Sequence, residues 1–211
     1  MTSTSTPADI VREYGPFEGA ASVHGVTFDG ALVWFASGDR LNALDPNSGA
    51  IVRTLEVTAS AGTAFDGRHL FQLAGDRIHK IDPRTGEVLG SIPAPERDDN
   101  AGLTWAEGSL WVGQYRGRKI RQIDPATGAV LRSLDSDRFV TGVTFVGGEL
   151  WHGTGEGGAE LRRIDPRSGE VVERLAMPEG HAITGLESNG KDLLFAGGGR
   201  SGRVRAVRKR A

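Results

Sequence analysis

One six-residue pattern occurs four times in this chain, and its spacing restricts the fold more than any other feature. Leucine or isoleucine is followed by Asp-Pro, one variable residue, Ser or Thr, and Gly. Proline favours the first corner of a tight turn, and glycine accepts the left-handed backbone that ends it. Each copy therefore predicts a hairpin between two strands. The aspartates, 37, 42 and 41 residues apart, are Asp45, Asp82, Asp124 and Asp165. A period of about 40 residues is typical of the four-stranded blades of β-propellers.

A second, glycine-led pattern precedes each of these turns and occurs once more near the end of the chain. Each copy leads through a short turn into an apolar run that carries one aromatic residue, as expected for two strands of a hairpin. The copies are Gly25-Val26-Thr27-Phe28, Gly62-Thr63-Ala64-Phe65, Gly102-Leu103-Thr104-Trp105, Gly142-Val143-Thr144-Phe145 and Gly185-Leu186-Glu187-Ser188.

The fifth repeat ends without its turn or its last strand, and the start of the chain supplies a matching segment. Ile10 to Tyr14 resembles Ile51 to Leu55, the outer strand of the first repeat. Pairing this segment with the C-terminal strands would close a ring and remove its open edges. We therefore predict an all-β, five-bladed β-propeller with four antiparallel strands per blade, its last blade closed by the N-terminal strand. Residues 9–211 form this single domain, and residues 1–8 are expected to be a flexible N-terminus.

The composition excludes several classes of site. The 211 residues contain no cysteine, which excludes disulfides, thiolate zinc sites and cysteine nucleophiles. A net charge of −2 gives no general attraction to nucleic acid or anionic lipid, and the sequence contains no motif for a nucleotide, flavin or haem. Because no apolar segment approaches 18 residues and no secretory signal is visible, a cytoplasmic protein without nucleic-acid or membrane partners is expected.

Differences in segment length between the repeats predict where a binding site lies. The Asp-Pro turns have constant length, whereas the segments joining strands two to three and strands four to one vary. Both variable loops lie at the same end of a four-stranded blade, and binding residues usually lie on variable loops of a rigid frame. The predicted substrate-binding residues at this channel mouth are Asn100, Gln114, Tyr115, Arg116, Thr141, Thr184 and Arg200.

Three histidines fall in consecutive blades once the ring is closed. His24 begins blade one, His152 lies in the second strand of blade four and His181 approaches blade five. Neutral imidazoles with a nearby carboxylate such as Glu156 would suit one divalent metal ion. We therefore predict His24, His152 and His181 as metal ligands, and His24, His181 and Glu156 as catalytic residues. A packed core histidine is the alternative interpretation of His152, because it follows Trp151 in a buried strand.

The Asp-Pro pattern and the glycine-led pattern resemble those of the five-bladed glutaminyl cyclotransferase family, and the resemblance covers nearly the whole chain. The resemblance implies the same strand order and split last blade, with working residues directly before the first glycines. At those positions this sequence has His24, Ala61 and Ala101, and Gly199 replaces the lysine of the last blade. Since alanine at position 61 cannot transfer a proton, the resemblance implies the frame of that family without glutaminyl cyclisation.

A second resemblance is restricted to one repeat. The segments Val23-His24-Gly25-Val26 and Gly30-Ala31-Leu32-Val33-Trp34-Phe35 are similar to boxes of virginiamycin B lyase-like propellers. That resemblance implies metal-assisted elimination with histidine and glutamate. Of the residues that this chemistry uses, it assigns His24 alone in this sequence. We therefore expect a small-molecule enzyme or binder at the channel mouth, with lyase-type or cyclase-type chemistry. The alternative is a non-catalytic scaffold for a protein partner, and the sequence does not predict an oligomeric state.

Overall fold

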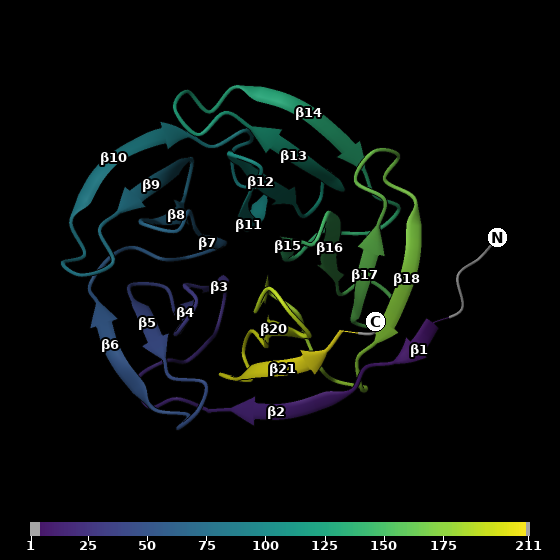
Figure 1. The fold of residues 1–211 in the computed structure, drawn as a ribbon, viewed down its shortest axis with the longest axis horizontal. Coiled ribbons are helices and arrows are strands. Elements are labelled where there is room, and N and C mark those ends of the chain that lie inside the picture. The colour runs from purple at the N-terminus through teal and green to yellow at the C-terminus, as the bar shows by residue number, and fades with distance from the viewer. Residues whose placement is uncertain (1–4, 210–211) are drawn as a thin grey trace.

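A computed structural model describes residues 5–209 of the chain. Five sheets, each built on four antiparallel strands, stand around a central axis (Figure 1), and the chain contributes no helix within the described residues. It follows that none of these residues belongs to a helix long and apolar enough to cross a membrane. The predicted five-bladed β-propeller is confirmed.

Blades 1 to 3 each form from consecutive segments, with the first strand nearest the axis and the fourth outermost. Blade 1 contains β3 (Val26–Phe28), β4 (Val33–Ala36), β5 (Leu41–Leu44) and β6 (Ile51–Leu55). Blade 2 contains β7 (Thr63–Phe65), β8 (Leu70–Ala74), β9 (Arg77–Ile81) and β10 (Val88–Pro93). Blade 3 contains β11 (Asn100–Ala106), β12 (Ser109–Gln114), β13 (Lys119–Ile123) and β14 (Val130–Asp135).

Blades 4 and 5 include the N-terminal segment of the chain. Blade 4 contains β15 (Val143–Val146), β16 (Glu149–Thr154), β17 (Glu160–Ile164) and β18 (Val171–Ala176), with β1 (Ser5–Pro7) added to its outer edge. Blade 5 contains β19 (Gly185–Ser188), β20 (Leu193–Gly197), β21 (Val204–Arg208) and, as its outermost strand, β2 (Ile10–Tyr14).

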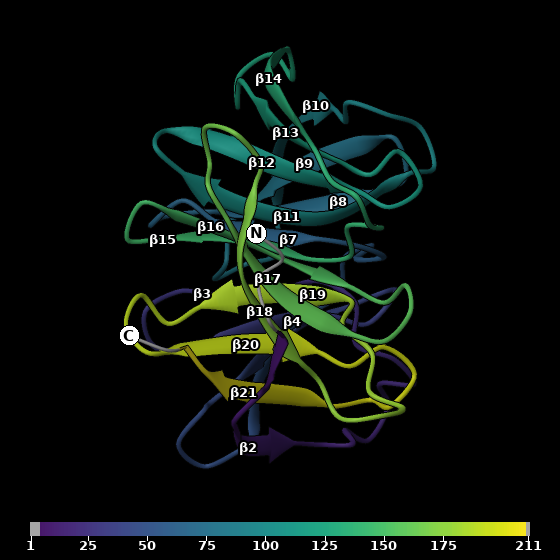
Figure 2. The ribbon, with the colours of Figure 1, turned by 90° about the vertical axis from the view of Figure 1, so that its right-hand side faces the viewer.

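The ring is closed by pairing between the two ends of the chain. Strand β2 runs antiparallel to β21, from Ile10 opposite Val207 to Tyr14 opposite Val204, and Figure 2 shows β21 between β20 and β2. The guanidinium of Arg205 donates to the Glu13 carboxylate across this pair at 2.9 Å. The predicted closure by the N-terminal strand is therefore confirmed.

Part of the N-terminal segment that was predicted to be flexible forms a strand. Of the predicted flexible segment 1–8, residues 1–4 lie outside the described residues, and Ser5–Pro7 form β1, parallel to Arg174–Ala176. The amide of Ala8 also donates to the carbonyl oxygen of Ala176 at 2.8 Å. An outer strand leaves one row of backbone groups unpaired, so a short extended segment gains hydrogen bonds by lying beside it.

Each Asp-Pro pattern forms the tight turn that the sequence predicts. In the first copy, the Asp45 carboxylate accepts a hydrogen bond from the amide of Asn47 at 2.8 Å and from the Ser48 hydroxyl at 2.8 Å. These hydrogen bonds, first that from the Asn47 amide, hold the pKa of Asp45 below its usual value. The turn ends at Gly49 with φ of +82°, a conformation that favours glycine.

The hydrophobic core lies within and between blades rather than at one centre. Trp34, Trp111 and Trp151 are almost completely buried, each between its own blade and a neighbour. Stacked ring pairs also cross the blade boundaries, such as Phe71 with Trp105, whose centroids are 5.6 Å apart. Because every blade covers the face of the next, the aromatic residue of each repeat fills one inter-blade gap.

A belt of five glycines surrounds the central axis where the innermost strands begin. A Cβ atom on Gly102 would lie 2.7 Å from the Val143 nitrogen and 2.8 Å from the Cα of Gly142 in the next blade. The first glycines of the other blades meet their neighbours in the same manner. Glycine is therefore required here for close backbone approach between blades, and not for a turn.

Candidate functional site

A cavity of about 220 Å³ lies at the channel mouth, on the side where the innermost strands begin. The five residues that directly precede the belt glycines all contribute to its wall, so every blade supplies one side chain. The lining residues are His24, Ser60, Ala61, Asn100, Ala101, Tyr115, Thr141 and Thr184. The structure therefore brings together four of the predicted substrate-binding residues, which come from blades 3, 4 and 5, and His24 from blade 1.

His24 is the lining residue whose side chain can change protonation near neutral pH. Partial burial lowers its pKa below 6.5, so the imidazole is neutral at pH 7. Its Nε2 atom lies 2.8 Å from the Ser22 hydroxyl. A neutral imidazole in this position can accept a proton from a bound molecule or donate one hydrogen bond to it.

Two polar side chains of the cavity wall have atoms without a protein partner. Thr141 is 8% exposed, and its hydroxyl finds no hydrogen-bond partner within residues 5–209. The side-chain oxygen of Asn100 also has no hydrogen-bond partner among these residues, although the side-chain nitrogen of Asn100 donates to the Glu96 carbonyl. Buried polar groups are normally hydrogen-bonded. Both atoms are fully buried, so a molecule in the cavity would bond to them, and remove that deficit, only once the side chains turn toward it.

Tyr115 forms the wall of the cavity on the blade 3 side, and its loop is fixed by Asp99. The Asp99 carboxylate accepts hydrogen bonds from the amides of Arg116, at 2.6 Å, and Gly117, at 2.7 Å. The Tyr115 ring packs against Phe139 with the centroids 4.5 Å apart. This aromatic wall is therefore held in place before any molecule binds.

The remaining predicted substrate-binding residues lie near the mouth but outside the cavity wall. Gln114 is 1% exposed at the end of β12, and its side-chain nitrogen has no hydrogen-bond partner among the described residues. Arg116 and Arg200 are exposed on the loops that follow β12 and β20. Thr184, by contrast, lines the cavity, and its hydroxyl donates to the Val23 carbonyl at 2.6 Å across the blade 5 to blade 1 boundary.

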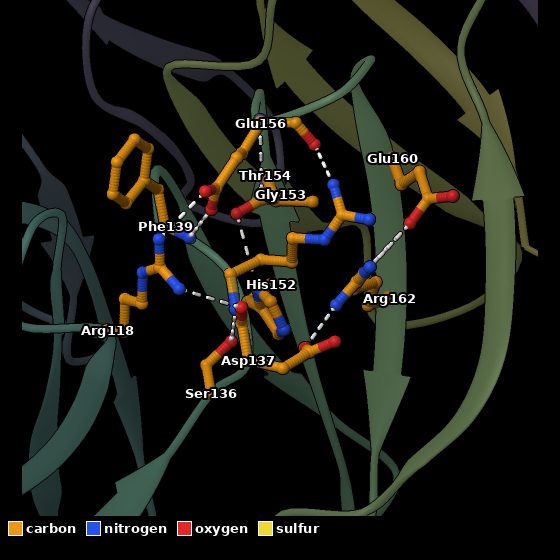
Figure 3. A network of polar contacts seen from close by, with 11 residues as sticks. Arg118, Ser136, Asp137, Phe139, His152, Gly153, Thr154, Glu156, Glu160 and Arg162 are labelled. Carbon is orange, nitrogen blue, oxygen red and sulfur yellow. Dashed lines mark hydrogen bonds and ion pairs between the residues drawn. The ribbon is translucent and has the colours of Figure 1, made fainter.

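Glu156 is bound to arginine and to backbone groups rather than to histidine. Its carboxylate accepts hydrogen bonds from the Arg118 guanidinium at 2.7 Å and from the Phe139 amide at 3.3 Å, and its carbonyl oxygen accepts one from Arg138. Figure 3 shows these contacts joining the mouth loops of blades 3 and 4. Glu156 is therefore a connection between two loops.

His152 is fully buried in β16, at the base of the same network. Its Nδ1 lies 3.2 Å from the Gly153 carbonyl oxygen, and its cross-strand neighbour Arg162 pairs with Asp137 at 2.5 Å and Glu160 at 2.9 Å (Figure 3). Burial is the main cause that lowers the pKa of His152 to about 4. The structure thus favours the alternative interpretation of a packed, neutral core histidine.

The predicted three-histidine metal site is not formed. His181 lies half-exposed in the loop after β18, where its Nδ1 faces the Glu179 carbonyl oxygen at 3.3 Å, and like His152 it lies outside the mouth cavity. Among residues 5–209 there is no group of three or more histidine, aspartate or glutamate side chains placed to hold a metal ion. Side chains from adjacent blades do not meet when they extend from different strands of those blades and lie at different positions along the channel axis.

Sequence reasoning missed three polar residues of the channel. Ser22 contacts His24, and Ser60 lines the cavity; neither stands in a recognisable pattern. Glu187 lies deeper in the channel, where its carboxylate accepts hydrogen bonds from threonines of three blades. The sequence does mark Glu187: in the fifth copy of the glycine-led pattern, glutamate stands at the position that threonine occupies in three of the other copies.

The fold has a close counterpart among solved structures. The chain superimposes on Myxococcus xanthus glutaminyl cyclase with a TM-score of 0.81, at 18% sequence identity, covering 98% of this chain and 97% of that one. This likeness shows a shared propeller frame and confirms the resemblance in fold. No curated protein matches the chain by sequence.

A family model extends over almost the entire propeller. The model PQQ_2, described as outer membrane protein assembly factor BamB, matches residues 18–211. The matched region begins after β2 and includes all the belt glycines and all four Asp-Pro turns. By this match, the chain belongs to the PQQ_2 family of β-propellers.

Proposed function

We propose that the chain binds a small, uncharged polar molecule in the mouth cavity. The observation that carries this proposal is the pair of unpartnered polar atoms, the Thr141 hydroxyl and the Asn100 side-chain oxygen, in a wall built from all five blades. Among the described residues, those that line the wall include no carboxylate, lysine or arginine, and the histidine is neutral at pH 7, so a charged ligand would find no counter-charge in the wall itself. The cavity is smaller than the ~300 Å³ lower limit of drug-sized sites.

The test is binding of small neutral polar compounds to the purified protein at pH 7.5, measured by thermal shift and then by calorimetry. Thr141→Val keeps the size of the side chain and removes the unpartnered hydroxyl, so we expect about a tenfold or greater loss of affinity for a bound compound. Thr85→Val, in a turn at the opposite end of blade 2, is the control and should bind normally. Equal affinity in both variants would contradict the proposal.

His24 is the proposed proton-transfer group if the bound molecule also reacts. His24 lines the cavity, and its neutral imidazole can act as a general base at pH 7. The glutaminyl cyclase in the structural comparison is an enzyme, which is compatible with catalysis on this frame. His24→Gln should then abolish turnover while binding is retained. Turnover is measured by mass spectrometry of the bound compound. Unchanged turnover would exclude this role for His24.

A protein-binding scaffold is the second candidate, favoured by the outer strands and by the family description. Aliphatic side chains on the outer strands are exposed by 39–58%, and the matching family model is named after an assembly factor. Exposed aliphatic groups are a common feature of protein interfaces. Under this candidate, Leu89→Ser and Leu131→Ser would weaken capture of a partner and Thr141→Val would not. The reverse pattern supports the cavity.

A further inference from the structure

One carboxyl group lies alone inside the central channel, below the glycine belt. Glu187 follows Gly185 by two residues on β19, so its side chain points toward the axis on the far side of the belt from the mouth cavity. Glu187 as a residue is partly exposed to the channel, and groups from four blades pack around its carboxylate. This burial raises the pKa of Glu187 to about 7, against hydrogen bonds that act to lower it.

The hydrogen bonds to this carboxylate come from three separate blades. The Thr27 hydroxyl of blade 1 donates to Oε2 at 3.1 Å, and the Thr104 hydroxyl of blade 3 lies 3.3 Å from the same oxygen. The Thr144 hydroxyl of blade 4 donates to Oε1, which also accepts the Ser188 amide at 2.9 Å. Since Glu187 itself belongs to blade 5, one side chain connects four of the five blades at the axis.

No cation neutralises this carboxylate among the described residues that pack on β19. The strands β3, β11, β15 and β20, which contact it, contain no titratable side chain. Strand β16 contains two: Glu149 pairs with Arg163 at 2.5 Å, and the buried His152 faces the Gly153 carbonyl. The channel therefore offers the ionised form hydrogen-bond donors but no opposite charge.

We propose that Glu187 is a pH-sensitive element that sets the stability of the ring. When protonated, it connects the four blades at the axis as a neutral group, and when it ionises, a charge without a counter-charge in the channel weakens this connection. This element is independent of the mouth cavity and of any ligand there. The neutral carboxyl can donate its O–H to one of the surrounding threonine hydroxyls, which accept as well as donate, whereas a carboxylate without a counter-charge in the channel is costly. The folded protein therefore holds this proton more tightly than the unfolded chain does.

The sign of the effect follows from linkage. A group that binds its proton more tightly in the folded state contributes stability that is complete below its unfolded pKa, here 4.5, and is lost as pH rises to about 7. Above that window the loss is constant. Unlike a salt-bridged carboxylate, Glu187 therefore makes the protein more stable toward acid.

The test compares urea unfolding of the wild type and Glu187→Gln at several pH values from 5 to 8. The amide keeps the shape of the carboxyl and cannot ionise, so the folding equilibrium constant of the variant relative to wild type should rise about tenfold or more across this range. Glu87→Gln removes the same charge from an exposed turn and should give a ratio independent of pH. A flat ratio for Glu187→Gln as well would overturn the proposal.

A direct measurement keeps the proposal falsifiable if the glutamine variant does not fold. The carboxyl carbon of Glu187 in the wild-type protein, followed by NMR, should titrate near pH 7. Thr144→Val removes one donor to the ionised form and should raise the midpoint further, a change that a purely structural contact would not produce. A midpoint near 4.5, or one unchanged in Thr144→Val, would refute the proposal.

Discussion

Single residues in this chain behave according to the space and the charges around them, and His152 is an example. It is fully buried beside the Arg162 guanidinium, which itself pairs with two carboxylates. A protonated imidazole there would place a second cation in a region without water. The result is a neutral histidine whose role is packing, at a sequence position where a ligand was predicted.

The His152 environment predicts a stability loss in acid. Because its folded pKa, about 4, lies below the unfolded value of 6.5, the folded protein resists protonation, and stability falls as pH decreases through this window by roughly 3 kcal/mol. His152→Gln, which places glutamine where β8 has Gln72, should remove this dependence. Urea midpoints between pH 4 and 7 measure it. A variant that loses stability in acid as steeply as wild type would contradict the assignment.

The glycine belt gives a second prediction for single residues. Gly102→Ala places a methyl group 2.7 Å from the Val143 nitrogen, so blades 3 and 4 must separate, and we expect a loss of about 1–3 kcal/mol. Gly90→Ala is the matched control, because a Cβ there meets no atom within 4 Å, and it should be neutral or slightly stabilising. Urea denaturation of both variants measures the difference. Equal midpoints would show that the belt tolerates a side chain.

At the scale of strands, neighbouring blades are joined by arginines of the outer strands. Arg12 on β2 donates to the Pro46 carbonyl at 2.9 Å, and Arg53 on β6 donates to the Pro83 carbonyl at 3.0 Å. Opposite these arginines the third strand has Ala206 and Ala43. The outer strands β2 and β6 therefore each bind the Asp-Pro turn of the next blade.

Blade 2 lacks this arrangement, because Gly90 stands opposite Lys80 and leaves a groove of about 210 Å³ beside Pro125. The Lys80 ammonium covers Phe71 from the third strand instead, 5.7 Å from the ring centre. The pair Lys80→Ala and Gly90→Arg would recreate the pattern of blade 1. We expect Gly90→Arg, made in a Lys80→Ala background, to raise stability by about 1 kcal/mol through packing and a bond to the Pro125 carbonyl.

Thermal unfolding of Lys80→Ala with and without Gly90→Arg checks this expectation. The same arginine placed at Val88, an exposed residue two positions earlier on β10, is a control for the added charge alone. A gain shared by both positions, or no gain at position 90, would show that the groove does not act as an arginine site.

For the whole molecule, closure of the ring determines how cooperatively it unfolds. The outer strand β2 covers β21, and Tyr14 and Val204 belong to one core cluster with Phe35 of blade 1. Without β2, this cluster would be open to water and blade 5 would present an unpaired edge. Strand β1, by contrast, adds only a short parallel edge to blade 4.

Two N-terminal deletions separate these contributions. Removal of residues 1–8 should lower the melting temperature by only a few degrees, corresponding to about 1–2 kcal/mol. Removal of residues 1–14 should abolish a single cooperative transition and promote self-association. Calorimetry and light scattering of both proteins provide the measurement. A cooperative, monomeric product of the longer deletion would mean that the ring does not need its N-terminal strand.

The sequence alone determined the architecture, because each blade is specified locally. The Asp-Pro turns and the glycine-led boxes use backbone conformations and hydrophobic alternation that act within a few residues. The repeat count, the place of the variable loops and the split last blade follow from their spacing. Four of the predicted binding residues, Asn100, Tyr115, Thr141 and Thr184, consequently meet around one cavity.

Only the tertiary structure decided the environment of each polar side chain. That His152 is buried, that Glu156 binds Arg118 and that Glu187 receives hydroxyl groups from three blades depends on strands that are far apart in the chain. Burial and the identity of neighbouring charges set protonation and binding. Neither quantity is encoded near the residue itself, so the same residue types that predicted a metal site form a core contact, a loop connection and a channel carboxyl.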